Sequence, residues 1–525
     1  MPGLKHGGSC RKLTLALLCA FFILPQYSFA QKSITLQPYH WVYDYADELK
    51  LRYPELISFW ATQPQGYNTT AHLLKSHDST AVFASFLSKK IARNLYKFGR
   101  KGPIALEYPM IYLGSSLSEK YGSQVGNDRI LSSLRLYSGA RFSRRLSIFN
   151  AMNIDQSFGE DKQYIGKVWR DVTAITEQAY AQYQADDWLV KFGRDYLRWG
   201  RGYDAALAVS HASRPFDQFF LQLRSRRAQF SYFISKLNNI KIFSDADSLQ
   251  QEWANRYMSG GRLEFKLFNN KLELAFSQFV LWGGTHGLEF YYLNPFVFYH
   301  GEQLNEDPEI RANTLGLIDF SFYPRSGIEV YGQLLIDDIQ IEKKVPGDLE
   351  PNELGLLIGA RSADVLGVDG LTLGLEYTRV TNRTYNTLPL AEKFTHRNKP
   401  IGHFLGNDFD RWLFYGRKYI WKNLLLNARM DFRRHGEGRY NGDFDTPWLD
   451  FETAEGYSEP FPTGVVEYAR IYTLDLRWHP KSYFYLSMIG RAGDFSNYQN
   501  KPGEERTNRE LYLKLWLEWS FFSEI

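Results

Sequence analysis

The sequence is poor in cysteine and in long apolar runs. It has only two cysteines among its 525 residues, Cys10 and Cys19, and both lie in a segment that we expect to be removed during export. A mature chain without cysteine has no disulfide framework and no thiol chemistry. Beyond that segment, no apolar run approaches the ~18–20 residues of a membrane-spanning helix. These absences argue against a disulfide-stabilised secreted domain and against a helical membrane protein.

An excess of charge of one sign is also missing. The 62 basic and 58 acidic residues give a formal net charge of +4, and the two signs are interspersed. This balance gives no case for a nucleic-acid partner. Aromatic residues are abundant instead, at 16% of a chain whose mean hydropathy is −0.39. This mixture is odd for a soluble core but natural for a barrel with aromatic girdles around a polar lumen. A large soluble β-sandwich array is the alternative.

The amino terminus indicates export. Basic residues precede the apolar run 13–24, and the small-x-small triplet 28–30 follows it. We therefore expect a signal peptide over residues 1–30 and a mature chain that begins near Gln31. Lipidation of Cys19 is the competing interpretation, but the leucines just before it are bulkier than a lipoprotein signal wants.

Apolar residues recur at every second position from about residue 103 onward. In 511–522, one face of the predicted strand carries Leu511, Leu513, Leu515, Leu517, Trp519 and Phe521. The other face carries Lys514 and Glu518. An antiparallel sheet that faces plain water would also alternate. The number of such segments, the signal peptide and the closing strand together favour a transmembrane barrel. Further alternating segments are 262–267, 371–378, 424–433 and 472–479.

The length sets the size of this barrel. About 420 residues at roughly 22–26 per strand and connection give about 16–18 strands. We therefore predict an all-β fold, a transmembrane outer-membrane β-barrel of about 16–18 antiparallel strands over residues 103–525. Short periplasmic turns are expected at 268–271 and 323–327. Longer polar stretches, where recognition surfaces are to be sought, are expected outside at 343–353, 382–410 and 436–465.

The region 31–102 differs from the barrel. Apolar residues recur near helical spacing at 41–51 and again at 80–96. We predict a small N-terminal periplasmic helical segment of two or three helices. It either caps the barrel floor or docks a periplasmic partner.

One short segment combines guanidinium and aromatic groups, which suit sugar recognition because aromatic faces pack on C–H surfaces and arginines bind vicinal hydroxyls or acids. Its members are Arg194, Arg198, Trp199 and Arg201. The alternative is structural: these arginines would balance Asp195, Asp337 and Asp338 across the lumen wall and fix the barrel's register.

Catalytic and metal chemistry find little support. Asp337 and Asp338 are adjacent, so a strand would point them to opposite sides. Ser210 and His211 are adjacent too, and nothing marks the serine as a nucleophile elbow. The scattered histidines lack the spacing of a zinc site. We therefore expect no enzyme activity, no metal and no cofactor, and we assign His403 a loop-shaping or ligand-contacting role.

Three ordered blocks of the sequence resemble the Wzi-type capsule assembly proteins. The first block holds Phe192–Gly202, Leu207–Ser210 and Arg214–Asp217; the second holds Asn294-Pro295, Phe298-Tyr299, Asn313, Asp319, Tyr331–Gln333 and Asp337-Asp338; the third holds Glu376–Arg379 and Pro400–Asp408. Together they cover most of the predicted barrel.

The resemblance implies an outer-membrane barrel of about eighteen strands, with a periplasmic helical segment, that acts as a surface lectin and helps to anchor capsular or related polysaccharide. The aromatic excess fits the Bacteroidetes branch of the family, some of whose members are linked to gliding. The partners would be surface polysaccharide and outer-membrane lipid. The candidate polysaccharide-binding residues are Arg194, Arg198, Trp199, Arg201, Gln333, Asp337, Asp338, Glu376, His403 and Asp408.

Three other functions remain as alternatives. Charged inner faces could line a diffusion or transport channel. Ser210-His211 and the paired acids give weak support to an outer-membrane hydrolase. A surface adhesion or gliding component would share the barrel and differ in its deletion phenotype.

Overall fold

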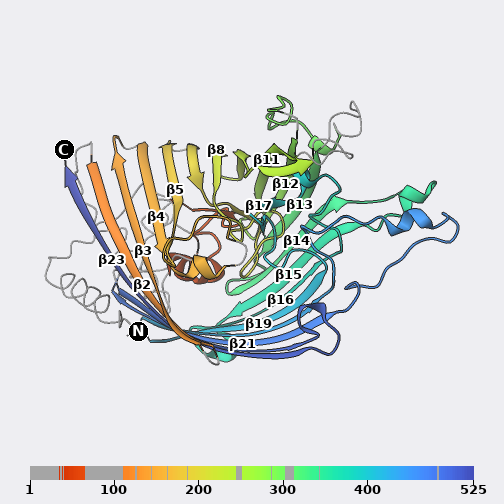
Figure 1. The fold of residues 1–525 in the computed structure, drawn as a ribbon. Helices are drawn as coiled ribbons and strands as arrows, with labels where there is room; N and C mark the ends of the chain where they lie inside the picture. The colour runs from red at the N-terminus through yellow and green to blue at the C-terminus, as the bar shows by residue number, and fades with distance from the viewer. Residues whose placement is uncertain are drawn as a thin grey trace, which may run out of the picture.

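A closed ring of antiparallel strands forms the body of the protein in the computed structural model (Figure 1). The structure describes residues 35, 38, 41–65, 110–124, 127–143, 145–161, 164–185, 187–243, 251–284, 287–301, 312–341, 343–421, 423–481 and 484–524. One sheet holds nineteen strands, and all but β10 follow one another around the ring, which gives eighteen. The ring closes because β2 pairs with both β3 and β23. The predicted barrel of about 16–18 strands is confirmed.

The first half of the ring consists of β2 (Met110–Gln124), β3 (Asn127–Arg141), β4 (Leu146–Asp155), β5 (Thr173–Gln184), β6 (Trp188–Asp195), β8 (Phe216–Arg224), β9 (Ala228–Lys236), β11 (Gln251–Leu267) and β12 (Leu272–Gly284). The second half consists of β13 (Asn313–Phe322), β14 (Ile328–Asp338), β15 (Glu353–Ala363), β16 (Leu371–Val380), β19 (Phe409–Trp421), β20 (Leu424–His435), β21 (Glu467–Lys481), β22 (Phe484–Ser496) and β23 (Glu505–Glu524).

Shorter elements complete the described part of the chain. They are β10 (Ile240–Phe243), which pairs with β11; β1 (Thr62–Gln63), which pairs with β7 (Arg198–Trp199); β17 (Thr395–His396), which pairs with β18 (Lys399–Pro400); and the helix α2 (Trp41–Arg52). Short turns join the strands at one end of the barrel, including the expected ones at 268–271 and 323–327. At the other end, the long loops 156–172, 196–215, 339–352, 381–408 and 436–466 connect the strands.

The alternation in the sequence becomes an outer and an inner face. Leu263 on β11 is 39% exposed, whereas its neighbour Arg262 is 1% exposed and contacts Asp319 inside the barrel. Leu474 and Met430, which also face outward, are about half exposed. Apolar outward faces and polar inward faces are the arrangement of a barrel in lipid. Among the described residues, no helix is long and apolar enough to cross a membrane.

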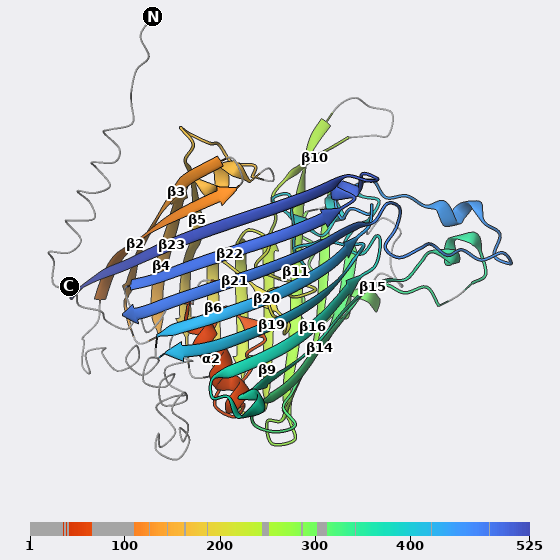
Figure 2. The same ribbon diagram turned by 90° about the horizontal axis from the view of Figure 1, so that it is seen from below.

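The helix α2 lies inside the ring of strands, near the end with the short turns (Figures 1 and 2). It coincides with the predicted stripe at 41–51, and Pro54 follows its end. Asp44 in the first turn and Arg52 in the last turn suit the helix dipole. The backbone oxygen of Leu51 accepts from Gly327 at 2.9 Å, which ties the helix to the β13–β14 turn. The second predicted stripe, 80–96, lies outside the described residues.

Two long loops also enter the lumen. Loop 196–215 carries Trp199 and Leu207, and loop 381–408 carries Ile401; all three side chains are fully buried in one cluster with inward-facing side chains of the wall. The amide of Ser210 donates to the oxygen of Ile401 at 2.9 Å, which joins the two loops. We call α2, residues 53–65 and these two loops the plug.

Candidate functional site

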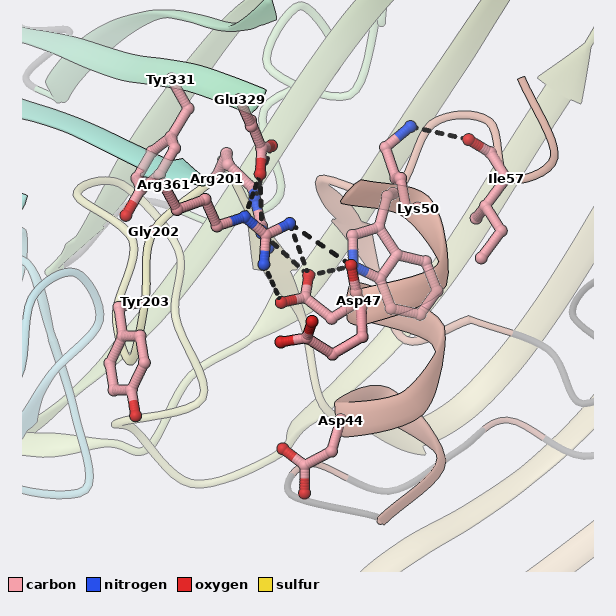
Figure 3. A network of polar contacts seen from close by, with 12 residues as sticks. Asp44, Asp47, Lys50, Ile57, Arg201, Gly202, Tyr203, Glu329, Tyr331 and Arg361 are labelled. Carbon is pink, nitrogen blue, oxygen red and sulfur yellow. Dashed lines mark hydrogen bonds and ion pairs between the residues drawn. The ribbon is translucent and has the colours of Figure 1, made fainter. Parts of the chain in front are cut away.

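A network of buried charges joins the plug to the barrel wall (Figure 3). Glu329 on β14 accepts from Arg201 Nε at 3.0 Å and from Arg201 Nη2 at 3.1 Å, and it also pairs with Arg361 on β15. Asp47 of α2 lies 2.8 Å from Arg201 and pairs with Arg361 as well. Two acids and two arginines from the helix, loop 196–215 and two strands are thereby held together.

The charges of this network are locked in their ionised forms. Burial alone would raise the pKa of Asp47, but Arg201, Arg361 and Arg417 hold it well below its ordinary value. Burial and the neighbouring Arg361 would lower the pKa of Arg201, but Asp47 and Glu329 raise it overall. Groups that stay charged at every ordinary pH do not exchange protons with a substrate, so the network is suited to bracing.

Similar ion pairs brace the rest of the plug. Arg411 on β19 holds Asp204 of loop 196–215 at 2.7 Å and Asp431 on β20 at 2.8 Å. Arg262 on β11 holds Asp319 and donates to the hydroxyl of Thr62 at 2.9 Å. Further pairs join α2 to the wall: Lys50–Glu273, Arg417–Asp44, Arg477–Asp44 and Arg52–Asp364.

The predicted residues Arg198 and Trp199 belong to the plug. Trp199 is fully buried, and its ring meets Phe233 edge-on at a centroid distance of 5.2 Å. Arg198 donates to the carbonyl oxygens of Gly202 at 2.5 Å and Ala205 at 3.2 Å. Their position inside the lumen gives them a packing and loop-shaping role in this structure.

Gln333 and Glu376 anchor loop 196–215 to the wall. Gln333 donates to the Arg201 carbonyl at 2.7 Å and accepts from the Leu207 amide at 2.9 Å. Glu376 accepts from the Tyr203 amide at 2.7 Å and from the Tyr331 hydroxyl at 2.9 Å. The loop approaches so closely that a Cβ on Gly200, whose φ is +108°, would lie 2.6 Å from the Gln333 side chain.

The predicted acids Asp337, Asp338 and Asp408 contact loop segments. Asp337 accepts from the Tyr385 amide at 2.6 Å, and Asp338 accepts from Gln340 at 3.1 Å. Asp408 accepts from the amides of Gly438 at 2.9 Å and Thr463 at 3.0 Å. Each acid thus fixes the course of a neighbouring loop.

His403 shapes loop 381–408. Its ring is fully buried and stacks on Phe404 at 4.6 Å and on Phe409 at 4.7 Å. Burial and, next, the positive charge of Arg411 lower the pKa of His403 to about 3. The neutral ring accepts from the Leu405 amide at 3.2 Å. A general base that works near neutral pH does not fit this environment.

A cavity of about 340 Å³ remains in the lumen beside the plug. Its wall side includes Arg429, Lys514 and Trp516, so the inward face expected of the last strand is confirmed for Lys514. The side chain of Glu518 lies outside the described part of the structure. Acids from the plug, including Asp44, Asp47 and Asp204, face the same cavity.

Arg194 lies at the end of β6, next to loop 196–215. Its guanidinium donates to both carboxylate oxygens of Asp217, at 2.8 and 2.6 Å. It lines a cleft of about 770 Å³, which we call the loop-end cleft. The lining is formed by Ile154, Tyr164–Lys167, Trp169, Val172–Thr176, Arg194, Arg214, Pro215 and Arg397.

Sequence reasoning missed most of the loop-end cleft. Arg214 was noticed only as part of a block, and Lys167, Trp169 and Arg397 were not selected. Arg397 reaches the cleft because the tip of loop 381–408 crosses to β8, where His396 contacts the Pro215 carbonyl at 3.3 Å. No local sequence pattern predicts that loop 381–408 reaches β8. The local sequence signal is a tryptophan close to basic residues, Trp169 with Lys167 and Arg170.

No group of three or more metal-binding side chains that could hold an ion occurs among the described residues. The cleft and the lumen cavity therefore have to be judged by their arginines, acids and aromatic rings.

Comparisons with known proteins agree with this architecture. The sequence profile of the family described as capsule assembly protein Wzi matches residues 112–510. Among curated proteins, none matches the chain. A solved structure of Escherichia coli Wzi, described as an outer membrane protein involved in group 1 capsule assembly and as a carbohydrate-binding β-barrel, is similar with a TM-score of 0.58 at 15% identity. That match covers 90% of this chain and 97% of the other, and it supports the fold.

Pseudomonas aeruginosa OccD3 gives a weaker match, with a TM-score of 0.44 at 10% identity over 78% of this chain and 91% of the other.

Proposed function

The chain belongs to the family of capsule assembly protein Wzi, and from this premise we propose that it is a non-enzymatic outer-membrane barrel that binds surface polysaccharide. In this proposal the protein helps to assemble or anchor capsular or related polysaccharide on the cell. The observation that carries the proposal is the loop-end cleft, in which arginines and aromatic rings meet at one end of a filled barrel.

The lining of the cleft suits sugars. Trp169 is 70% exposed, with the Arg170 guanidinium 5.1 Å from its ring, and it lines the cleft together with Tyr164. Its exposed ring offers flat aromatic surface for the C–H face of a sugar. Arg194, Arg214 and Arg397 add planar groups that bind paired oxygens. A volume of about 770 Å³ is within the usual range for a ligand site.

The outward face of the barrel supports a position in a membrane. Exposed leucines, phenylalanines and tryptophans follow the outer side of the strands, where they would contact lipid. We place this membrane at the cell surface, with the long loops outside and α2 at the periplasmic end. A periplasmic partner at α2 is part of the proposal.

A binding experiment tests the proposal. The full chain is purified in detergent, and its affinity for surface polysaccharide isolated from the source strain is measured by titration calorimetry. We expect specific binding, and we expect Trp169→Ala to weaken it at least tenfold. Trp253→Ala is the matched control, because Trp253 is 66% exposed and does not line the cleft. A wild-type chain that binds no surface polysaccharide would contradict the proposal.

A role in surface adhesion or gliding, which the Bacteroidetes branch suggests, makes a different prediction. Deletion of the gene would then abolish spreading on agar while capsule staining stays at the wild-type level. Our proposal predicts the reverse: reduced cell-bound polysaccharide, with more of it released into the medium.

A further inference from the structure

Four distant segments of the chain line the loop-end cleft, and one of them is the end of β6 with Arg194. Loop 156–172 forms one side, Arg214 and Pro215 just before β8 form another, and the β17–β18 tip supplies Arg397. The tip is fixed in place because the Arg397 amide donates to Asn238 at 2.6 Å. It is also fixed by Lys399, which pairs with Asp161 at 2.7 Å. These contacts hold the segments that line the cleft in fixed positions.

The charge of the cleft is unbalanced. Its described lining holds Lys167, Arg194, Arg214 and Arg397 and no carboxylate. Asp217 balances Arg194 through two hydrogen bonds. The nearest carboxylate oxygen to Arg214 belongs to Asp161 and is 3.8 Å away, which is too long for a hydrogen bond. The lumen cavity differs, because acids of the plug face its arginines.

Two donors in this cleft are buried without an acceptor. They are Nη2 of Arg214 and Nε of Arg397. The Arg214 guanidinium lies over the Phe158 ring at 4.4 Å and the Tyr164 ring at 5.3 Å, so cation–π contacts fix its orientation. Burial and, next, the nearby charge of Arg194 lower the pKa of Arg397, while the carboxylate of Asp217 acts in the opposite direction.

We propose that the loop-end cleft binds an anionic group carried by a sugar residue, with Arg214 and Arg397 as the groups that receive the charge. This inference rests on the proposed function and names the class of polysaccharide that it would take. A carboxylate on a uronic acid and a phosphate substituent share the required chemistry, because each offers several acceptor oxygens to guanidinium groups. A neutral sugar would leave the excess positive charge uncompensated.

The anionic group and the sugar ring have separate places. The lining residues differ in exposure, since the Arg214 side chain is 13% exposed and Trp169 is 70% exposed. The charged group would bind between Arg214 and Arg397, and the ring that carries it would extend toward Trp169. Lys167, which is exposed, adds positive charge to the lining.

Titration calorimetry on the detergent-purified full chain tests this inference with three probes. Trigalacturonate supplies carboxylates, mannose 6-phosphate supplies a phosphate, and maltotriose is neutral. We expect at least one anionic probe to bind tenfold or more tightly than maltotriose, and the better of the two identifies the source of the charge. Equal affinity for maltotriose would overturn the inference.

Variants locate the binding. We expect Arg397→Gln to weaken binding of the preferred anionic probe at least tenfold and Lys167→Gln to weaken it severalfold. Arg226→Gln is the matched control, because it removes an exposed arginine at the short-turn end and should leave affinity within twofold. Heat-modifiable gel migration verifies that each variant is folded. If Arg397→Gln does not fold, Lys167→Gln still tests the cleft.

The outcomes separate this inference from the proposed function. If the wild-type chain binds surface polysaccharide and both cleft variants bind it equally well, the inference fails and the proposed function stands. If the wild-type chain binds an anionic probe in the cleft but no surface polysaccharide, the proposed function fails. A chain that binds neither overturns both.

Discussion

Glu329 is the residue whose replacement should reveal the cost of the buried charges. Among the residues that the structure describes, the variant Glu329→Gln leaves Asp47 as the ion-pair partner of Arg201 and Arg361. Breaking a buried ion pair by removing one partner typically costs about 3–5 kcal/mol. We expect a loss of that size in the free energy of unfolding, measured by urea titration in detergent. Asp494→Asn, which removes an exposed partner of Arg509, should change stability little, and a similar small effect at Glu329 would contradict the prediction.

Trp199 should matter for stability before it matters for binding. Its fully buried ring packs on Phe233 and Phe279. Trp199→Ala is expected to cost about 3–5 kcal/mol of unfolding free energy, as for other large-to-small core substitutions. Trp199→Phe should cost clearly less. The reverse order in the same urea titration would show that the ring does not act through packing.

The sequence predicts which residue types face the lumen but not their partners. Arg201 balances carboxylates, as the structural alternative predicts. Its partners, however, are Glu329 and Asp47. The alternative had named Asp195, Asp337 and Asp338. Period-two alternation shows that a side chain points inward. Its partner is set by loop paths over more than a hundred residues, as for Arg201 and Glu329, and these paths leave no local pattern.

At the scale of elements, periodic segments are predictable and the loops that fill the barrel are not. The helix α2 and the strands follow from their apolar spacing because each buries one face. Residues 382–410 are expected outside from the sequence, and loop 381–408 does begin at the loop end, but its residue Ile401 is buried in the lumen. Its sequence mixes polar and apolar residues without a period, so only tertiary packing decides where it lies.

Loop 339–352 should respond to pH through Glu350. Burial and, next, the negative charge of Asp338 raise the pKa of Glu350 to about 7. This raised pKa means that the folded loop favours the protonated carboxyl group. The folded loop therefore loses stability as pH rises from the unfolded pKa of about 4.3 to the folded pKa of about 7. Above pH 7 its stability does not fall further through Glu350. We therefore compare the rate of trypsin cleavage at Lys343 or Lys344 in the wild-type chain with the rate in a Glu350→Gln variant. The ratio of the wild-type rate to the variant rate should be higher at pH 8 than at pH 5.

The ratio of the two cleavage rates cancels the pH dependence of trypsin itself. A ratio that stays constant over this range would show that Glu350 does not titrate within the loop.

For the whole molecule, the plug predicts poor conductance. Loops 196–215 and 381–408, α2 and residues 53–65 occupy the lumen and are ion-paired to the wall. In planar bilayers we expect the full chain to show no large steady conductance. A variant in which residues 386–400 are replaced by a short glycine–serine link should conduct more, provided that its gel migration shows a folded barrel. A large steady current from the wild-type chain would favour the channel alternative.

The strand number of the molecule was predictable and the division of its interior was not. Length and period two give about 16–18 strands, because each strand and connection needs a similar number of residues. The separation of the interior into a braced plug, a lumen cavity and the loop-end cleft depends on where two loops fold. Of the predicted site residues, Arg194 lines the loop-end cleft, and the predicted segment next to it, with Trp199 and Arg201, belongs to the plug.

The pairing of β2 with β23 also constrains the timing of biogenesis. These strands begin and end the ring, and they are matched residue by residue from Met110 opposite Glu524 to Gln124 opposite Glu510. The pairing between β2 and β23 cannot form until nearly the entire polypeptide has reached the membrane. Since α2 precedes β2 in the chain, the helix must already be within the curling sheet, or must follow it inward, when the seam is sealed. Closure of the ring is thus a late step of assembly, because it needs the last strand.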